Sequence, residues 1–210
     1  MCIRDRLTTG ADGRLELAPA FAAPGLDGDT VELTLELPSL DGVAIDVTTT
    51  LGDVRTEGTH GPLTARTRTG DLRIIGHVGA LDLDCSTGLI SVEGQSGGPV
   101  KAVSSVGSIE LVLDDLGGGP VVADSTTGDI LLSVGPGFRG LVNLEAAKGH
   151  LHVEDRSTRA VRQELGEGEG TLLVVERTPI SSLGTSLGDI RVLLRPGADE
   201  ATTGNPAAGD

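Results

Sequence analysis

A glycine recurs along most of this chain at a nearly fixed interval, and this repeat limits the possible folds more than any other feature. The interval is 18 to 21 residues, and each copy resembles the segment Thr67-Arg68-Thr69-Gly70-Asp71. A period of this length is typical of arrays in which one structural unit stacks on the next. The recurring glycines are Gly52, Gly70, Gly88, Gly107, Gly128, Gly149, Gly170 and Gly188.

The residues around each of these glycines alternate between apolar and polar. Positions two and four after the glycine, and five and seven before it, are apolar in nearly every copy; the exceptions are Thr56, Gln163 and Ser181. The positions between them are mostly charged, hydroxyl-bearing or glycine. Alternation with a period of two is the pattern of a half-buried strand, so each repeat predicts two β-strands that flank a Thr/Ser-x-Gly-Asp corner. Helices are excluded almost everywhere.

The expected fold is all-β: a single-domain parallel β-solenoid, or β-helix, of about eight coils of 18–21 residues with two strands per coil. An antiparallel meander would carry Asn-Gly or Asp-Gly at its two-residue hairpins, whereas the Gly-Asp order dominates here. A β-sandwich is the alternative fold. The 32 glycines suit a chain that turns many corners at positive φ, and two Phe with no Trp or Tyr leave an aliphatic core.

The chain divides into four parts. Residues 1–6 differ from the rest and resemble a translated sequencing adapter, so we interpret them as a non-native scar. Residues 7–42 contain two alternating segments, 15–17 and 31–37, that are predicted strands, are out of register with the repeat and are expected to cap its first coil. The repeat domain is expected over 43–196, and a disordered tail over 197–210.

The charge and composition argue against several classes of partner. A formal net charge of -15 disfavours binding to nucleic acid phosphates or to an anionic membrane surface, because both need a basic face. The shortage of aromatic residues weakens base stacking and aromatic sugar platforms. No apolar run approaches the roughly 20 residues that span a bilayer, so membrane attachment would require an anchor upstream of the given sequence.

The two cysteines are too few for a disulfide framework and have no metal-binding spacing. Cys85 stands three residues before Gly88, where other copies have Thr67, Ser104 or Ser125. We therefore predict that Cys85 is a small buried thiol.

One segment matches the G-x-S-x-G motif of hydrolases, with Ser96 in the nucleophile position of Gly94-Gln95-Ser96-Gly97-Gly98. That motif requires a following helix, whereas Pro99 and a further strand follow here. We interpret the segment as an ordinary connection between coils and predict no catalytic residue.

The repeated aspartates and the four histidines are candidate metal ligands. Asp53, Asp71, Asp129 and Asp189 each follow a repeat glycine and could form a column like that of calcium-binding β-rolls, but Leu89, Ser108, His150 and Thr171 interrupt it. The favoured interpretation is that these carboxylates bond backbone donors at the corners. His150 and His152 share a strand face without a third ligand, and His60 and His77 are expected at the surface. We predict no metal and no cofactor.

Two surface features could serve binding. Arg55 and Arg73 are expected in one outward column, with Arg66 and Arg68 on the other strand; they form either an anion-binding patch or ordinary balanced surface charge. The outward positions of the later coils are less polar and would form an apolar stripe that contacts a partner or is covered by residues 155–163. These apolar residues are Val112, Leu131, Leu173, Val175 and Leu193.

The repeat, as in Thr67–Ile74, Ser125–Ile130 and Thr185–Ile190, resembles a bacterial β-strand-repeat family described as adhesin-like and otherwise as a domain of unknown function. The resemblance covers about residues 30–195. It implies a β-helical domain of a cell-envelope protein, often with a signal or membrane anchor, and it brings no catalytic residues.

The expected function is therefore that of a non-enzymatic, adhesin-like binding or structural module at the bacterial cell envelope or outside the cell. Its partner would be a protein or a surface glycan, and not nucleic acid. An intracellular scaffold or regulatory sensor is an alternative. A polysaccharide-acting β-helix enzyme is a third reading, which would need clustered acids and usually aromatic subsites.

Overall fold

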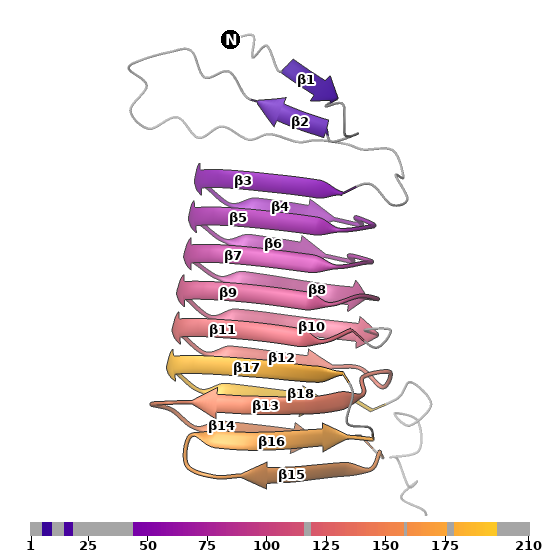
Figure 1. Ribbon diagram of the computed structural model, residues 1–210, viewed down its shortest axis with the longest axis vertical. Coiled ribbons are helices and arrows are strands. Elements are labelled where there is room, and N and C mark those ends of the chain that lie inside the picture. Colours follow the sequence, from indigo (N-terminus) through magenta and orange to yellow (C-terminus); the bar gives the residue numbers. More distant parts are fainter. Residues whose placement is uncertain are drawn as a thin grey trace, which may run out of the picture.

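The computed structural model describes residues 6–9, 15–18, 44–115, 119–157, 159–175 and 179–196, and each regular element within these ranges is a β-strand (Figure 1). Two large sheets stack face to face along most of the molecule, with the apolar core between them. Nearly all strand pairs in both sheets are parallel. The all-β prediction is confirmed, and the arrangement is consistent with a β-helix.

The strands alternate between the two sheets as the chain advances. The larger sheet contains β3 (Ile45–Leu51), β5 (Leu63–Thr69), β7 (Leu81–Thr87), β9 (Val100–Val106), β11 (Val121–Thr127), β17 (Ile180–Leu187), β13 (Gly140–Ala146), β16 (Glu169–Val174) and β15 (Val161–Leu165), in that spatial order. The smaller sheet contains β4 (Val54–Glu57), β6 (Leu72–Ile75), β8 (Ile90–Ser96), β10 (Ile109–Asp115), β12 (Ile130–Val134), β18 (Ile190–Leu194) and β14 (Leu151–Asp155). Below, a coil is one strand of the larger sheet together with the smaller-sheet strand that follows it.

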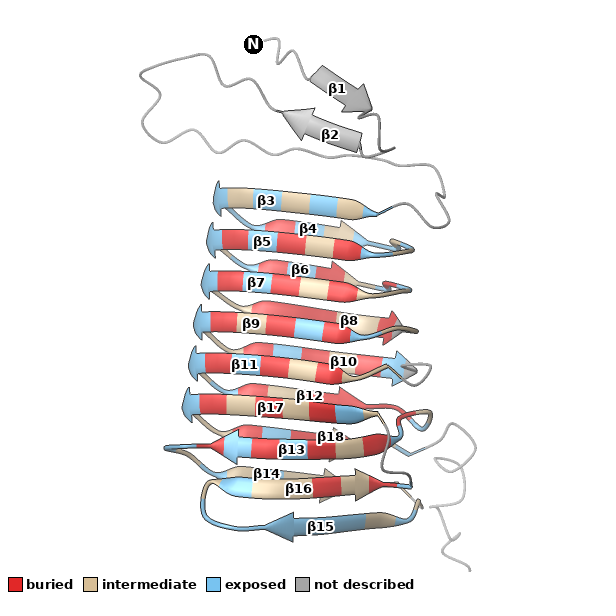
Figure 2. Ribbon diagram, viewed as in Figure 1, coloured by how far each residue is buried: buried red, intermediate tan, exposed pale blue. Residues whose placement is uncertain are grey.

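The predicted alternation places the apolar columns inside. In β5, Leu63, Ala65 and Thr67 are buried while the residues between them are partly or fully exposed, and β7, β9 and β11 repeat this pattern (Figure 2). Each fully buried Leu or Ile contributes roughly 1.5–3 kcal/mol of hydrophobic stabilisation. Because the register is preserved across most of the coils, like residues stack on like, as with Leu72 beside Ile90; the end of the β8–β10 pair, where the register shifts after Val112, is an exception.

The expectation of about eight parallel coils is wrong at Gly170. There, β15 and β16 form an antiparallel hairpin, and both strands lie in the larger sheet. The hairpin closes at Gly166, whose N–H donates to the carbonyl of Glu169 at 2.8 Å, so the chain reverses within one sheet instead of crossing to the other. Both predicted strands are present, but the turn at Gly166–Gly170 joins them as a hairpin within one sheet instead of a coil. Seven coils remain in the described part of the chain, one for each strand of the smaller sheet.

The coils also do not stack in sequence order. The coil formed by β17 and β18 lies between the coil of β11 and β12 and the coil of β13 and β14 (Figure 1). We call residues 180–194 the inserted coil. At the far end, β16 pairs antiparallel with β13, and β15 forms the charged outer edge of the larger sheet.

The N-terminal part contains a two-stranded antiparallel sheet of β1 (Arg6–Thr9) and β2 (Leu15–Ala18). The second of these strands includes the predicted segment 15–17. The predicted segment 31–37, the tail 197–210 and Cys2 lie outside the described residues. Among the described residues, no helix is long and apolar enough to cross a membrane.

Candidate functional site

The repeat glycines form a column at one corner of the stack, with backbone packed on backbone. Their φ angles lie between +129° and +152° at Gly52, Gly70, Gly88, Gly107, Gly128 and Gly188. A Cβ at Gly107 would overlap the carbonyl oxygen of Gly88, and the same holds for Gly188 against Gly128. Both the backbone conformation and the close stacking therefore require glycine.

The predicted carboxylate column is a ladder of hydrogen bonds. The N–H of Asp71 donates to Oδ1 of Asp53, and the N–H of Leu89 donates to Oδ1 of Asp71, both at 2.8 Å. Farther along, the N–H of Asp189 donates to Oδ1 of Asp129 at 2.8 Å. The carboxylates bond backbone donors, as the corner interpretation predicts, and the donors belong to the neighbouring coil. Among the described residues, no group of three or more His, Cys, Asp or Glu side chains could hold a metal ion.

A hydroxyl column lies on the inner side of the same corner. The hydroxyls of Thr67, Ser125 and Thr185 donate to the carbonyls of Gly52, Gly107 and Gly128 at 3.0–3.2 Å. Cys85 occupies this column, with its Sγ 3.3 Å from the carbonyl oxygen of Gly70. The thiol is buried and unpaired with another cysteine, which confirms the prediction, and burial raises its pKa, so it stays protonated.

The prediction of a surface position is wrong for His77. Its side chain is fully buried at the second corner of the stack, where Thr59, His77 and Gln95 follow one another at 18-residue intervals. His77 Nδ1 lies 2.8 Å from Thr59 Oγ1, and Gln95 Nε2 donates to the carbonyls of Gly79 and Gly97. His77 Nε2 and Gln95 Oε1 have no hydrogen-bond partner in the described part of the chain. Burial lowers the pKa of His77 below 6.5.

The hydrolase-like segment has none of the surroundings that its motif requires. Ser96 ends β8, and the chain passes through Gly97 and Pro99 directly into β9, with no helix between. The side chain of Ser96 lies outside the described residues. Gln95, next to it, is a buried structural residue of the second corner.

His150 and His152 lie apart from any third ligand in the described structure. His150 precedes β14, and its backbone N–H donates to Oδ1 of Asp189 at 2.9 Å, while its Nδ1 is 3.4 Å from the same oxygen. The backbone hydrogen bond is the main reason that the pKa of Asp189 falls below its ordinary value. The hydrogen bond from His150 to Asp189 extends the aspartate ladder to the coil of β13 and β14.

The arginines lie where the repeat predicts, and acidic residues surround them. Arg55 and Arg73 are neighbours across β4 and β6. Arg55 lies 3.5 Å from Glu57, Arg73 lies 3.0 Å from Glu93, and Arg66 on β5 lies 3.2 Å from Asp82. These exposed pairs support balanced surface charge rather than an anion-binding patch.

The predicted apolar stripe is divided between two opposite faces. Val112, Leu131 and Leu193 are half-buried on the smaller sheet, whereas Leu173 lies on β16 of the larger sheet. Val175 follows β16 and is 47 % exposed. The hairpin that replaces the expected coil at Gly170 is the reason, because it places Leu173 on the other sheet.

A different apolar row crosses the outer face of the larger sheet. Each of its residues either alternates with buried residues of its own strand or immediately precedes the first buried residue of that strand, so the alternation turns it outward. Strand pairing joins Ile180 to Leu141 and Leu141 to Leu173, and backbone hydrogen bonds place the equivalent residues of the earlier coils at the same step: Pro62, Ala80, Pro99 and Pro120. All are exposed or half-buried. We call Pro62, Ala80, Pro99, Pro120, Ile180, Leu141 and Leu173 the outer apolar row.

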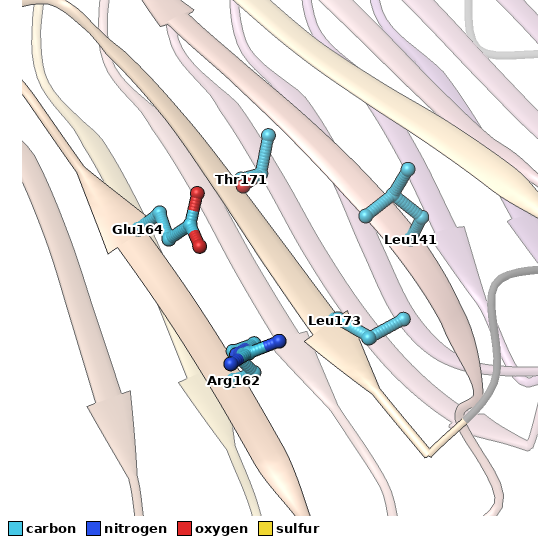
Figure 3. A pocket seen from close by; sticks show the side chains of 5 residues that line it. All are labelled: Leu141, Arg162, Glu164, Thr171 and Leu173. Carbon is cyan, nitrogen blue, oxygen red and sulfur yellow. The ribbon is translucent and has the colours of Figure 1, made fainter.

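Two shallow hollows lie along this row. One, of about 260 Å³, is lined by the row from Pro62 to Pro120 and by the neighbouring outward residues Asp82 and Lys101. The other, of about 210 Å³, lies over β13, β15 and β16, where Leu141 and Leu173 are accompanied by polar side chains (Figure 3). The polar residues of the second hollow are Arg162, Glu164 and Thr171.

Sequence reasoning missed the outer apolar row and the Thr59–His77–Gln95 column. Both had a signal, because Thr59, His77 and Gln95 recur every 18 residues and a proline or alanine precedes each early strand of the larger sheet. Comparison of the chain with protein-family models, curated proteins and solved structures finds no match.

Proposed function

We propose that this chain is a non-enzymatic, adhesin-like binding or structural module of a bacterial cell envelope, built on a parallel β-solenoid. The solenoid reading is supported by the parallel pairing of the seven coils among the described residues and by the Asp-to-backbone hydrogen bonds that recur at several of their corners. The repeated Gly, Asp and Thr/Ser residues form the corner ladders. The residues on the outer faces of the two sheets take no part in these ladders, and they would bind a partner.

The observation that carries this proposal is the outer apolar row. Small and apolar side chains at one outward step of successive coils present a continuous strip, with a hollow near each end. Exposed apolar strips of this kind mark contact surfaces. The only aromatic side chain in the described part of the chain is Phe138, which is buried. A strip without aromatic rings fits an apolar protein segment better than a glycan.

The test of function compares two double variants. Leu141→Asp with Ile180→Asp places two carboxylates in the strip, whereas Asn143→Asp with Ser182→Asp places the same two charges on the same strands, one outward step away and outside both hollows; both are directly opposed pairs. We expect saturable binding of the labelled protein to intact cells of its source, lost in the first variant and kept in the second. Equal loss in both variants would remove the strip from the proposal.

The test of location uses the gene with its natural upstream sequence, expressed in its own host. We expect the protein in the envelope fraction and accessible to protease on intact cells. Protein protected in the cytosol would overturn the envelope proposal and leave the intracellular scaffold or sensor as the better reading.

A further inference from the structure

The inserted coil, residues 180–194, separates two coils that are neighbours in sequence. On one side β17 pairs with β11 and β18 with β12; on the other, β17 pairs with β13 and β18 with β14. Three hydrogen bonds, made by the side chains of Ser181 and of Arg195 just after the coil, hold it to the earlier coils. Ser181 Oγ accepts from the N–H of Val121 at 3.0 Å, and Arg195 Nη2 donates to the carbonyl of Leu113 and to Asp114 Oδ1, both at 2.8 Å.

The two sides of the inserted coil present the same register to it. Ile190 pairs with Ile130 on one side and with Leu151 on the other, and Val192 likewise pairs with Leu132 and Val153. The corner ladder is equally regular, since Asp189 N–H donates to Asp129 and Asp189 Oδ1 accepts from His150 N–H. When the inserted coil withdraws, the coils that flank it can therefore pair directly with each other. Less core then stays open to water, which lowers the cost of withdrawal.

Val175, the last described residue before residue 179, has a strained backbone. Val175 has a φ of +62°, and it is the only non-glycine residue with a positive φ in the described part of the chain. This conformation is a clear outlier for a β-branched residue. Val175 lies five residues before Ile180, immediately after β16. Short strained hinges of this kind promote the exchange of structural elements between copies of a protein.

We propose that two copies of this chain exchange their inserted coils and thereby form a dimer. Each inserted coil lies in the slot of the other copy, where it makes the contacts that it makes here with its own chain. The exchanged dimer differs from the monomer only at the hinge around Val175, which can then extend and lose its strain. The partner is thus a second copy of the same chain, and the surface is the slot between the coils of β11–β12 and β13–β14.

Paired cysteines distinguish exchange from any other dimer. Thr127 and Leu187 are register partners across β11 and β17, and Thr69 and Thr87 hold the matching position across β5 and β7. Register partners in adjacent strands are close enough for a disulfide. Each pair is introduced into a chain carrying Cys2→Ser and Cys85→Ser. The dimer is obtained by refolding at protein concentrations from about 1 µM to 1 mM and isolated by size exclusion with light scattering.

After oxidation of that dimer, we expect T127C/L187C to run as a covalent dimer on a non-reducing gel and T69C/T87C to run as a monomer. If T127C/L187C also runs as a monomer, or if the chain without new cysteines forms no dimer at 1 mM, the proposal is wrong. Val175→Gly tests the hinge, because glycine adopts φ +62° without strain. We expect the dimerisation constant of this variant to fall at least about tenfold. An unchanged constant would overturn the role given to the strained hinge.

Discussion

In the glycine column, the absence of a Cβ allows the backbones of successive coils to stack closely. At Gly107 the stacked carbonyl of Gly88 occupies the space that a Cβ would need, whereas at Gly52 the nearest atom to a Cβ would be Thr49 Oγ1 at 3.9 Å. The φ angles of the two glycines are similar, +144° and +129°. The pair therefore separates the cost of the backbone conformation from the cost of the overlap.

We expect Gly52→Ala to lower the free energy of unfolding by about 1–3 kcal/mol, the cost of an unfavourable φ. Gly107→Ala should lower it by at least about 4 kcal/mol, because a coil must also move away from its neighbour. Urea unfolding followed by circular dichroism measures both values. Equal losses would show that the backbone conformation alone requires glycine.

The aspartate ladder leads to a second prediction at this scale. Asp129 Oδ1 accepts from the N–H of Asp189, so Asp129→Ala removes an acceptor and should cost about 1–2 kcal/mol. Asp129→Asn keeps an amide oxygen in place and should cost less than half as much. Calcium should leave the melting temperature of the unmodified protein unchanged. A calcium-dependent rise that is lost in Asp129→Asn would instead support a metal column.

At the scale of the element, the joint 76–80 between β6 and β7 holds a buried imidazole without a carboxylate partner. Burial lowers the pKa of His77, and His60 in the neighbouring joint adds repulsion to the charged form. The unfolded chain therefore binds a proton at His77 below about pH 6.5, while the folded chain does not. Stability is complete above that pH, falls as the pH decreases, and falls no further below the folded-state pKa.

We expect urea midpoints to decrease from pH 7 to pH 5, with the largest rise in hydrogen exchange at residues 76–80. His77→Gln should remove most of this dependence, because Gln95 occupies the equivalent position one coil later. His152→Gln, an exposed histidine on the smaller sheet, serves as the control and should leave it intact. If the imidazole of His77 titrates at or above pH 6.5 by NMR, this account is wrong.

The elements also show where the sequence predicts structure and where it does not. Alternation around Gly70 or Gly128 fixes strands, corner and inward residues, because each depends on neighbours in sequence. The same alternation fits β15 and β16, and only the turn at Gly166 separates a hairpin from a coil. The stacking order of the coils could not be predicted from the sequence either. Ile130, Leu151 and Ile190 occupy equivalent positions in their coils, so no local sequence signal indicates which coils are neighbours. The outer apolar row follows from that order, because Ile180 is brought beside Leu141 only by the insertion.

At the scale of the whole molecule, a common register makes the coil a unit that can be removed. Nine strands in the larger sheet give a stack of roughly 38 Å, at about 4.8 Å per step. Deletion of residues 71–88 joins Gly70 to Leu89 and removes β6 and β7, so that β5 leads into β8 and the stack loses the equivalent of one coil. Four buried aliphatic side chains leave with it: Leu72, Ile74, Leu81 and Leu83.

We expect this deletion variant to fold, with a β-sheet spectrum, a lower free energy of unfolding and a length reduced by about 4.8 Å in X-ray scattering. Deletion of residues 71–80 removes β6 and its joint but keeps β7, which leaves two successive strands of the larger sheet without a crossing between them. That variant should not fold cooperatively. If the deletion of a whole coil unfolds the protein as completely, the coils are not equivalent units.

The inserted coil has a consequence for how the protein is made. Residues 140–155 leave the ribosome before residues 180–194, yet their place in the finished stack lies beyond them. The first five coils can assemble in the order of their synthesis, at the pace of translation. Before residues 180–194 emerge, the coil of residues 140–155 can pair with the fifth coil on one side and with β16 on the other. Its pairing with the fifth coil must then open to admit residues 180–194. Completion of the molecule therefore waits for a late rearrangement, and a translational pause downstream of residue 155 would prolong the life of the incomplete form.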